Sequence, residues 1–251
     1  MTDPFLITMA VLAVIIVGIS KSGFGAAFGN LAVPLVALAT TPAHAIALLL
    51  PSLMVMDLIG LVVFRRRVDL ALLKRLVPAG LIGIALGALT FRWVSVDGLK
   101  LTLGLLAILF VLQRWSGIAS RLHALRDGPV DRWLGRIWSL VSGFTSFVAH
   151  AGGPPLSMYL IPKQLDRVIY VGTSAVFFAV INASKWVPYL WLDLFPRETL
   201  VAGAALAVVS PVGYWIGLRS LTWINGPVFY RVIELALLAS GVKLIWDGAG
   251  W

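Results

Sequence analysis

The stretch VSGFTSFVAHAGGPPLSMYLIP, residues 141–162, decides how this chain folds. It is apolar enough to enter a membrane, but Gly152-Gly153-Pro154-Pro155 interrupts it, because glycines permit unusual dihedral angles and a proline favours the start of a new helix. An earlier apolar segment, residues 5–40, is interrupted by Lys21-Ser22-Gly23-Phe24-Gly25. Non-helical backbone at membrane depth is tolerated only where it is buried in protein or lines a wet cavity. The two interruptions therefore predict a cavity inside a membrane protein.

The composition supports a membrane location for the rest of the chain. Hydrophobic residues make up 60% of the sequence and charged residues 12%, against about 25% charged residues in soluble domains. Such a chain cannot cover its surface with polar groups, and apolar runs long enough to cross a bilayer recur along it. We therefore expect an all-α polytopic transmembrane bundle. Six uninterrupted runs are predicted to cross the membrane: residues 43–64, 72–91, 98–113, 167–190, 200–218 and 227–246.

Charge and motif content exclude several classes of function. The formal net charge of +9 comes from short basic clusters between apolar runs, such as Arg65-Arg66-Arg67. That pattern is typical of cytoplasmic loops of membrane proteins and not of a nucleic-acid surface. The sequence has no cysteine, which excludes disulfides and thiolate metal sites. It also has no nucleophile elbow, zinc-protease motif or phosphate loop, so we expect neither an enzyme nor a bound cofactor or metal.

The two interruptions belong to an internal repeat. An offset of 120 relates Gly23, Phe24 and Pro34 to Gly143, Phe144 and Pro154, and an offset of 130 relates Gly83 and Gly87 to Gly213 and Gly217. Repeats with paired broken helices are typical of secondary transporters. We expect a first transmembrane repeat over residues 1–114, a basic cytoplasmic linker over residues 115–131 and a second repeat over residues 132–251.

The orientation of the repeats depends on whether the interrupted segments cross the membrane. If each enters and returns as a re-entrant hairpin, every half has three crossings and the two halves are inverted. The basic clusters then become cytoplasmic and the acidic loop at residues 193–198 lies outside, as the positive-inside rule favours. We expect this arrangement in the cell inner membrane, with both termini outside. Helices that merely kink at Gly and Pro are the alternative.

Polar side chains that flank the interruptions are candidate contacts for a bound anion. A polar residue within an apolar segment is a functional candidate by default, although a single hydroxyl often bonds only the backbone of its own helix. The short helices after the interruptions are also expected to point free backbone N–H groups toward mid-membrane, where an anion binds more readily than a cation. The candidates are Lys21, Ser22, Asn30, Thr145, Ser146 and His150.

Three more candidates lie inside uninterrupted apolar runs. Asn182 and Lys185 are three residues apart and so share a helix face. Lys185 either faces the anion path or extends to the outer headgroups. Asp57 is the only carboxylate deep in an apolar segment of the first half. It is a candidate for coupling transport to protons, or it forms a structural salt bridge with Lys21 or Lys185.

Several motifs together resemble a known family. The chain carries Gly23-Phe24-Gly25 followed by Pro34, then Gly143-Phe144 followed by Gly152-Gly153-Pro154-Pro155, and finally Val171-Gly172-Thr173-Ser174-Ala175. This set resembles the TauE/SafE family of sulfite and organosulfonate exporters, also grouped as the toluene-sulfonate uptake permeases. By matching position, the resemblance implies that the anion path is lined by Gly23, Phe24, Gly25, Gly143, Gly152, Gly153, Thr173 and Ser174. In the first half, Leu49-Leu50-Pro51-Ser52 replaces the Gly-Thr-Ser run, so equal contact of both turns with the substrate stays open.

The prediction is therefore a secondary transporter of small sulfur-containing anions, such as sulfite, sulfoacetate or other organosulfonates, that works by alternating access. A passive anion channel is the alternative, because it shares every feature except a coupling group such as Asp57. The expected partners are the small anionic substrate, membrane lipids and, in a homodimer, a second copy of the chain. Nucleic acid is not expected.

Overall fold

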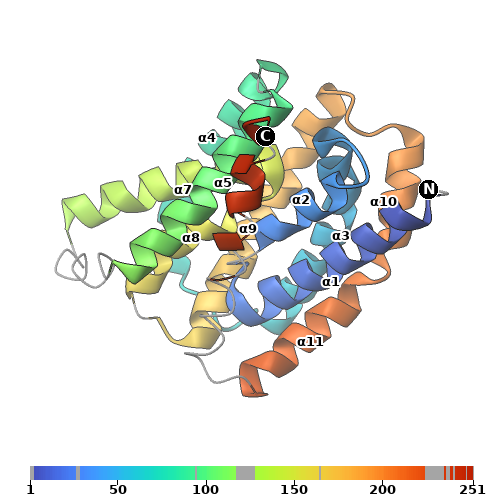
Figure 1. Cartoon of the computed structure of the whole chain (residues 1–251). Helices are drawn as coiled ribbons and strands as arrows, with labels where there is room; N and C mark the ends of the chain where they lie inside the picture. Colours follow the sequence, from blue (N-terminus) through green and yellow to red (C-terminus); the bar gives the residue numbers. More distant parts are fainter. Residues whose placement is uncertain are drawn as a thin grey trace.

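The fold is known from a computed structural model that describes residues 3–26, 29–93, 95–116, 128–163, 165–223, 235, 238–239, 241–246 and 248–250. The regular elements among these residues are all helices (Figure 1). Four helical spans are long and apolar enough to cross a membrane: Pro4–Phe24, Pro42–Val63, Leu70–Trp93 and Arg167–Trp191. The prediction of an all-α polytopic bundle is confirmed.

The remaining predicted crossings have mixed outcomes. Helices α10 (Arg197–Ala207) and α11 (Ser210–Trp223) cover the run predicted at 200–218. They are bent by 41° at their junction, and the pair counts as a fifth span if it crosses as one unit. Helix α5 (Val96–Trp115) contains the run predicted at 98–113. Most of the run predicted at 227–246, and most of the predicted linker, lie outside the described residues.

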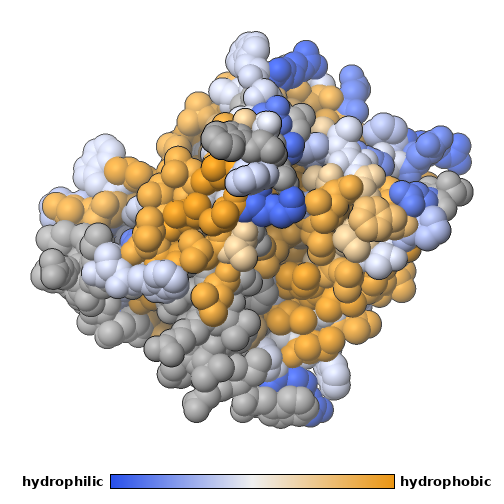
Figure 2. All heavy atoms as spheres, viewed as in Figure 1, coloured by the Kyte–Doolittle hydropathy of each residue, from blue (hydrophilic) through white to orange (hydrophobic). Residues whose placement is uncertain are grey.

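The outer surface of the bundle is apolar. Large hydrophobic side chains such as Val62, Val201 and Val208 are exposed. Figure 2 shows hydrophobic residues over most of the described surface in this view, with hydrophilic residues mainly toward its edges and one hydrophilic group above its centre. An exposed apolar surface of this extent needs a nonaqueous neighbour, and in a bundle of spanning helices that neighbour is lipid.

The second interrupted segment folds as a hairpin. Helix α8 (Gly153–Leu160) and the 3-10 turn Ile161–Lys163 run back along helix α7 (Pro129–Ala149). At the closed end, the Ser142 hydroxyl donates to the Gly152 carbonyl over 2.6 Å. At the open end, Lys163 Nζ lies 2.7 Å from an Asp131 carboxylate oxygen. The start of α7 and the end of the returning arm therefore lie together, so the segment doubles back.

The first interrupted segment has the same local geometry but a different break point. Helix α1 (Pro4–Phe24) continues through Lys21-Ser22-Gly23-Phe24, so the expected interruption there is wrong for all but Gly25. Gly25 ends the helix with a positive φ of 61°, a conformation that glycine adopts without strain. The short helix α2 (Ala32–Ala37) then packs beside α1. With 21 residues, α1 is about 32 Å long.

The two hairpins correspond at an offset of 125, not 120. Helices α1 and α7 begin at Pro4 and Pro129, and both end at a residue with positive φ. The capping hydrogen bonds also match: the Ala26 N–H donates to Ser20 over 3.0 Å, and the Ala151 N–H donates to Thr145 over 3.1 Å. The next helices, α3 (Pro42–Val63) and α9 (Arg167–Trp191), start at the same offset. Glycine spacing alone misplaced the correspondence.

Each hairpin packs against a helix of the other half through glycines. Helix α1 lies along α11, and α7 lies along α4 (Leu70–Thr90). A Cβ at Gly213 would overlap the Ile15 backbone, and a Cβ at Gly83 would overlap the Leu140 backbone. The two contacts are equivalent, because an offset of 125 relates Ile15 to Leu140 and an offset of 130 relates Gly83 to Gly213. The long hairpin helix of each half therefore packs against the equivalent helix of the other half.

Candidate functional site

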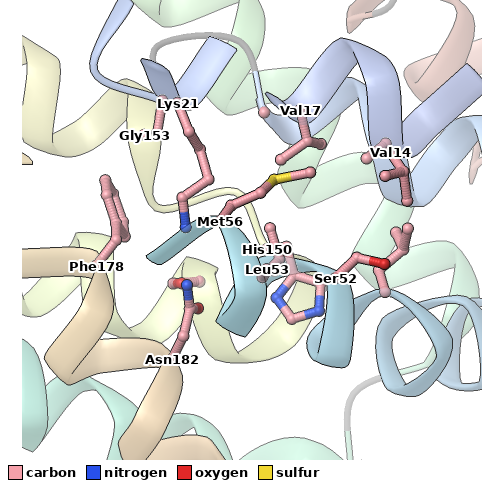
Figure 3. A pocket seen from close by; sticks show the side chains of 15 residues that line it. Val14, Val17, Lys21, Ser52, Leu53, Met56, His150, Gly153, Phe178 and Asn182 are labelled. Atoms are coloured by element: carbon pink, nitrogen blue, oxygen red, sulfur yellow. The ribbon is translucent and has the colours of Figure 1, made fainter. Parts of the chain in front are cut away.

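A small buried cavity lies where the two hairpin tips meet helices α3 and α9. It is lined by Val14, Val17, Lys21, Ala26, Gly29, Ala32, Leu49, Ser52, Leu53, Met56, Ser146, His150, Gly153, Phe178 and Asn182. In Figure 3, Lys21 and Asn182 point toward one another across it. Its volume of about 30 Å³ has room for one or two water molecules. The cavity therefore accommodates water but not a polyatomic anion.

A buried ion pair joins the first hairpin to α3. Lys21 Nζ contacts Asp57 Oδ1, and the side chains are 5% and 1% exposed. The Asn182 side-chain amide donates to the other carboxylate oxygen of Asp57 over 2.7 Å. The carboxylate is thus held from both sides, as a buried charge requires. The salt bridge between Asp57 and Lys21 was one of the two alternatives that the sequence left open.

The polar chain continues from Asn182 to the second hairpin. Lys185 is fully buried. Its ammonium group lies 2.8 Å from Asn182 Oδ1 and 2.9 Å from His150 Nδ1. His150 Nε2 lies 2.8 Å from the carbonyl oxygen of Ile46 in α3. Because a carbonyl can only accept, Nε2 carries the proton, and Nδ1 of a neutral imidazole accepts from Lys185. Lys185 therefore does not extend to the headgroups.

This cluster contains more basic than acidic side chains. It has two lysines, Lys21 and Lys185, and one carboxylate, Asp57. Lys185 has no carboxylate within salt-bridge distance among the residues that the structure describes. A buried charge without a counter-charge is strongly unfavourable. The arrangement is suited to a small anion, which would supply the missing negative charge.

Two residues at the centre of the cluster occupy equivalent positions in the internal repeat. At the offset of 125, Asp57 and Asn182 are equivalent positions, and they hydrogen-bond to each other. The charged neighbours do not repeat, because Lys21 corresponds to Ser146 and Lys185 corresponds to Gly60. The two halves therefore meet at residues of nearly equal shape and unlike charge.

Unpartnered polar atoms lie close to the cavity. The Ser52 hydroxyl, on the cavity wall, is buried and has no hydrogen-bond partner in the described part of the chain. The same holds for the Ser174 hydroxyl, which lies against Gly25, and for the Asn30 side-chain oxygen at the first tip. A buried polar group without a partner is destabilising by about 1–3 kcal/mol. Groups of this kind point to water or a ligand in another state of the site.

Backbone N–H groups contribute less to the site than the sequence led us to expect. Helix α8 begins Gly153-Pro154-Pro155, and prolines have no N–H to donate. Helix α2 has only six residues, so its dipole is short. The donors near the cavity are mainly side chains.

Seven of the predicted site residues are brought together. Lys21, Ser146, His150, Gly153 and Asn182 line the cavity, and Asp57 and Lys185 complete the polar chain behind it. The cavity also has neighbours that we did not predict. The Phe178 ring lies 6.0 Å from Lys21 Nζ. Gly29 and Ser52 also line the wall. The Ile46 carbonyl has no sequence signal at all, since every residue has one.

Other predicted residues shape the hairpins instead. Ser22 bonds back to the Gly18 carbonyl over 2.8 Å. Gly23 and Gly143 lie at the contacts with α11 and α4. Thr145 donates within the second turn, and Gly25 and Gly152 form the turns themselves. Phe24 joins a small apolar cluster with Val111. These residues hold the tips in place and do not line the cavity.

The Val-Gly-Thr-Ser run has a mixed placement. The Thr173 hydroxyl accepts a hydrogen bond of 2.9 Å from the backbone N–H of Asp69. A Cβ at Gly172 would overlap the Arg67 carbonyl. This part of the run therefore fixes the loop between α3 and α4, while Ser174 faces the first hairpin. Among the described residues, no group of three or more His, Asp or Glu side chains could hold a metal ion.

Comparison with known proteins agrees with this geometry. Searches against curated proteins and against solved structures find no match. A family model described as sulfite exporter TauE/SafE matches residues 10–244, which is nearly the whole chain and contains every residue of the polar cluster. Members of this family are membrane transporters of sulfur-containing anions. The chain belongs to the TauE/SafE sulfite exporter family.

Proposed function

We propose that the protein is a secondary transporter that carries small sulfur-containing anions, such as sulfite or an organosulfonate, by alternating access. The observation that carries the proposal is the buried cluster of two lysines and one carboxylate at the point where the hairpin tips meet. The cluster has one more basic than acidic side chain, so with both lysines charged it lacks one negative charge. An anion bound between Lys21, Ser52 and Ser146 is the simplest way to supply it.

The small volume of the cavity favours a carrier over a channel. Its volume of about 30 Å³ holds water but no sulfonate, and the hairpin tips and α3 surround it. An anion therefore enters only after the tips move apart. Alternate opening toward each side of the membrane would follow if one half rocks against the other. The matched glycine contacts of α1 with α11 and of α7 with α4 offer two equivalent interfaces for that motion.

The parity of the helices supports an inverted arrangement. If both hairpins are re-entrant and helices α3, α4 and α5 each cross, three crossings separate the hairpins and the second enters from the opposite side. With Arg65-Arg66-Arg67 in the cytoplasm, the N-terminus lies outside. The same side for the C-terminus, and the location in the inner membrane, stay predictions. A homodimer stays a prediction.

Reconstitution into liposomes tests the proposal. Uptake of radiolabelled sulfite and of radiolabelled isethionate is measured with and without a saturating amount of the unlabelled anion inside. A carrier accelerates uptake by exchange, whereas a channel does not. Lys21→Met is expected to lower the flux at least tenfold, while Lys74→Gln, which removes an exposed lysine of α4, leaves it unchanged. Equal flux in the Lys21 variant and the wild type would refute the site.

A further inference from the structure

We infer that the site selects anions with a single negative charge over anions with two, and that Asp57 sets this preference. The inference rests on the proposed function and specifies its substrate class. Sulfite, sulfate and many organosulfonates differ in charge at neutral pH, although each carries at least three oxygens on one sulfur atom. Charge is therefore the property by which a site of this size discriminates among them.

The charge count comes from every element packed around the cluster. Helix α1 contributes Lys21, α3 contributes Asp57 and α9 contributes Lys185. The end of α7 contributes His150, whose hydrogen bonds assign it the neutral form, and α11 contributes the phenol of Tyr214. In the occupied site the bound anion favours the charged form of both lysines. Two positive charges and one negative charge leave an excess of one positive charge.

An anion with one negative charge makes the occupied site neutral. An anion with two charges leaves a net negative charge in a region where the side chains of Asp57, Asn182 and Lys185 are at most 2% exposed. Water cannot reach such a charge to solvate it, and the surrounding dielectric is low. We expect a preference of about tenfold or more for the singly charged anion.

Asp57 is the residue that reduces the excess of positive charge in the occupied site from two to one. Asp57→Asn removes its charge while keeping its shape, so the excess rises to two and the preference should shift toward doubly charged anions. The double variant Lys21→Met/Asp57→Asn removes one charge of each sign and returns the excess to one. The amide oxygen that Asp57→Asn introduces can still accept the hydrogen bond from Asn182, because the Asp57 oxygen at 2.7 Å is the acceptor in the wild type.

The test compares isethionate, which has one charge, with sulfoacetate, which has two and a similar size. Dissociation constants are measured by calorimetry on detergent-purified protein. The wild type should bind isethionate at least about tenfold more tightly than sulfoacetate. Asp57→Asn should reduce or reverse this ratio by tenfold or more. The double variant should restore the ratio even where its absolute affinity is lower, and Lys74→Gln should not change it.

The outcomes separate the two proposals. If the wild type binds neither anion, nor sulfite, the proposed function itself fails. If it binds isethionate and sulfoacetate equally, anion binding stands and the charge rule is wrong. A ratio that stays at the wild-type value in Asp57→Asn also overturns the rule. If Asp57→Asn does not fold, the double variant decides: a sulfoacetate preference in it contradicts the charge count.

Discussion

The buried pair of Lys21 and Asp57 makes a strong prediction about stability. Its side chains are 5% and 1% exposed, so a charge left alone there finds no water. Removing one partner of such a pair is destabilising by about 3–5 kcal/mol, whereas replacing both by neutral groups is often close to neutral. We therefore expect Lys21→Met and Asp57→Asn each to lose about 3–5 kcal/mol and the double variant to lose about 1 kcal/mol. The resulting coupling energy is about 5 kcal/mol or more, since the two single losses sum to at least about 6 kcal/mol.

The assay is thermal unfolding in detergent, followed by intrinsic fluorescence of the ten tryptophans. Each single variant should unfold about 10 °C below the wild type, and the double variant within a few degrees of it. The exposed pair of Lys100 and Asp97, with an N–O distance of 3.2 Å, is the matched control, and its coupling should stay below about 1 kcal/mol. Losses at Lys21 and Asp57 that simply add in the double variant would refute the argument.

Three further predictions concern packing and topology. Gly143→Ala places a methyl group against the α4 backbone and should lower the unfolding temperature by several degrees, whereas Gly128→Ala, with open space around it, should not. Tyr189→Phe removes a buried hydrogen bond of 2.7 Å and should lower stability by about 1 kcal/mol without changing anion selectivity in calorimetry. Because the chain has no cysteine, Arg66→Cys and Asp193→Cys can be labelled singly in whole cells. An impermeant maleimide should reach only the second, and the reverse pattern would contradict the proposed orientation.

The uninterrupted helices were largely predictable from the sequence, but the ends of the hairpin helices were not. Continuous apolar runs predicted α3, α4 and α9 to within about two residues, since lipid-facing length is set by bilayer thickness. The end of α1 was harder to predict, because Lys21, Ser22 and Gly23 are all compatible with a helix. The decisive signal is the residue with positive φ. In the first half this residue is Gly25, but in the second it is His150. The two equivalent positions therefore cannot be recognised by residue type.

The members of the buried polar cluster were predictable, but their arrangement was not. Lys21, Asp57, Asn182, Lys185 and His150 stand out because polar side chains are rare in apolar runs. Which atoms they bond depends on residues that are distant in sequence, such as the 125 residues between Asp57 and Asn182. The same limit applies to hydroxyls, whose partners come from the tertiary fold. Matching position to a family motif therefore assigned to the anion path a threonine that instead bonds the α3–α4 loop.

At the centre of the molecule, the shape of the side chains follows the internal repeat, but their charge does not. Asp57 and Asn182 occupy equivalent positions and differ by one oxygen and one amide nitrogen, so either half offers the other nearly the same surface. Two conformations that exchange the roles of the halves can therefore share one packing arrangement. The positive charges are not repeated, because the position equivalent to Lys21 is Ser146 and the position equivalent to Lys185 is Gly60. In an alternating-access cycle, the repeated shape would support the motion, and the unrepeated charges would bind the anion in both states.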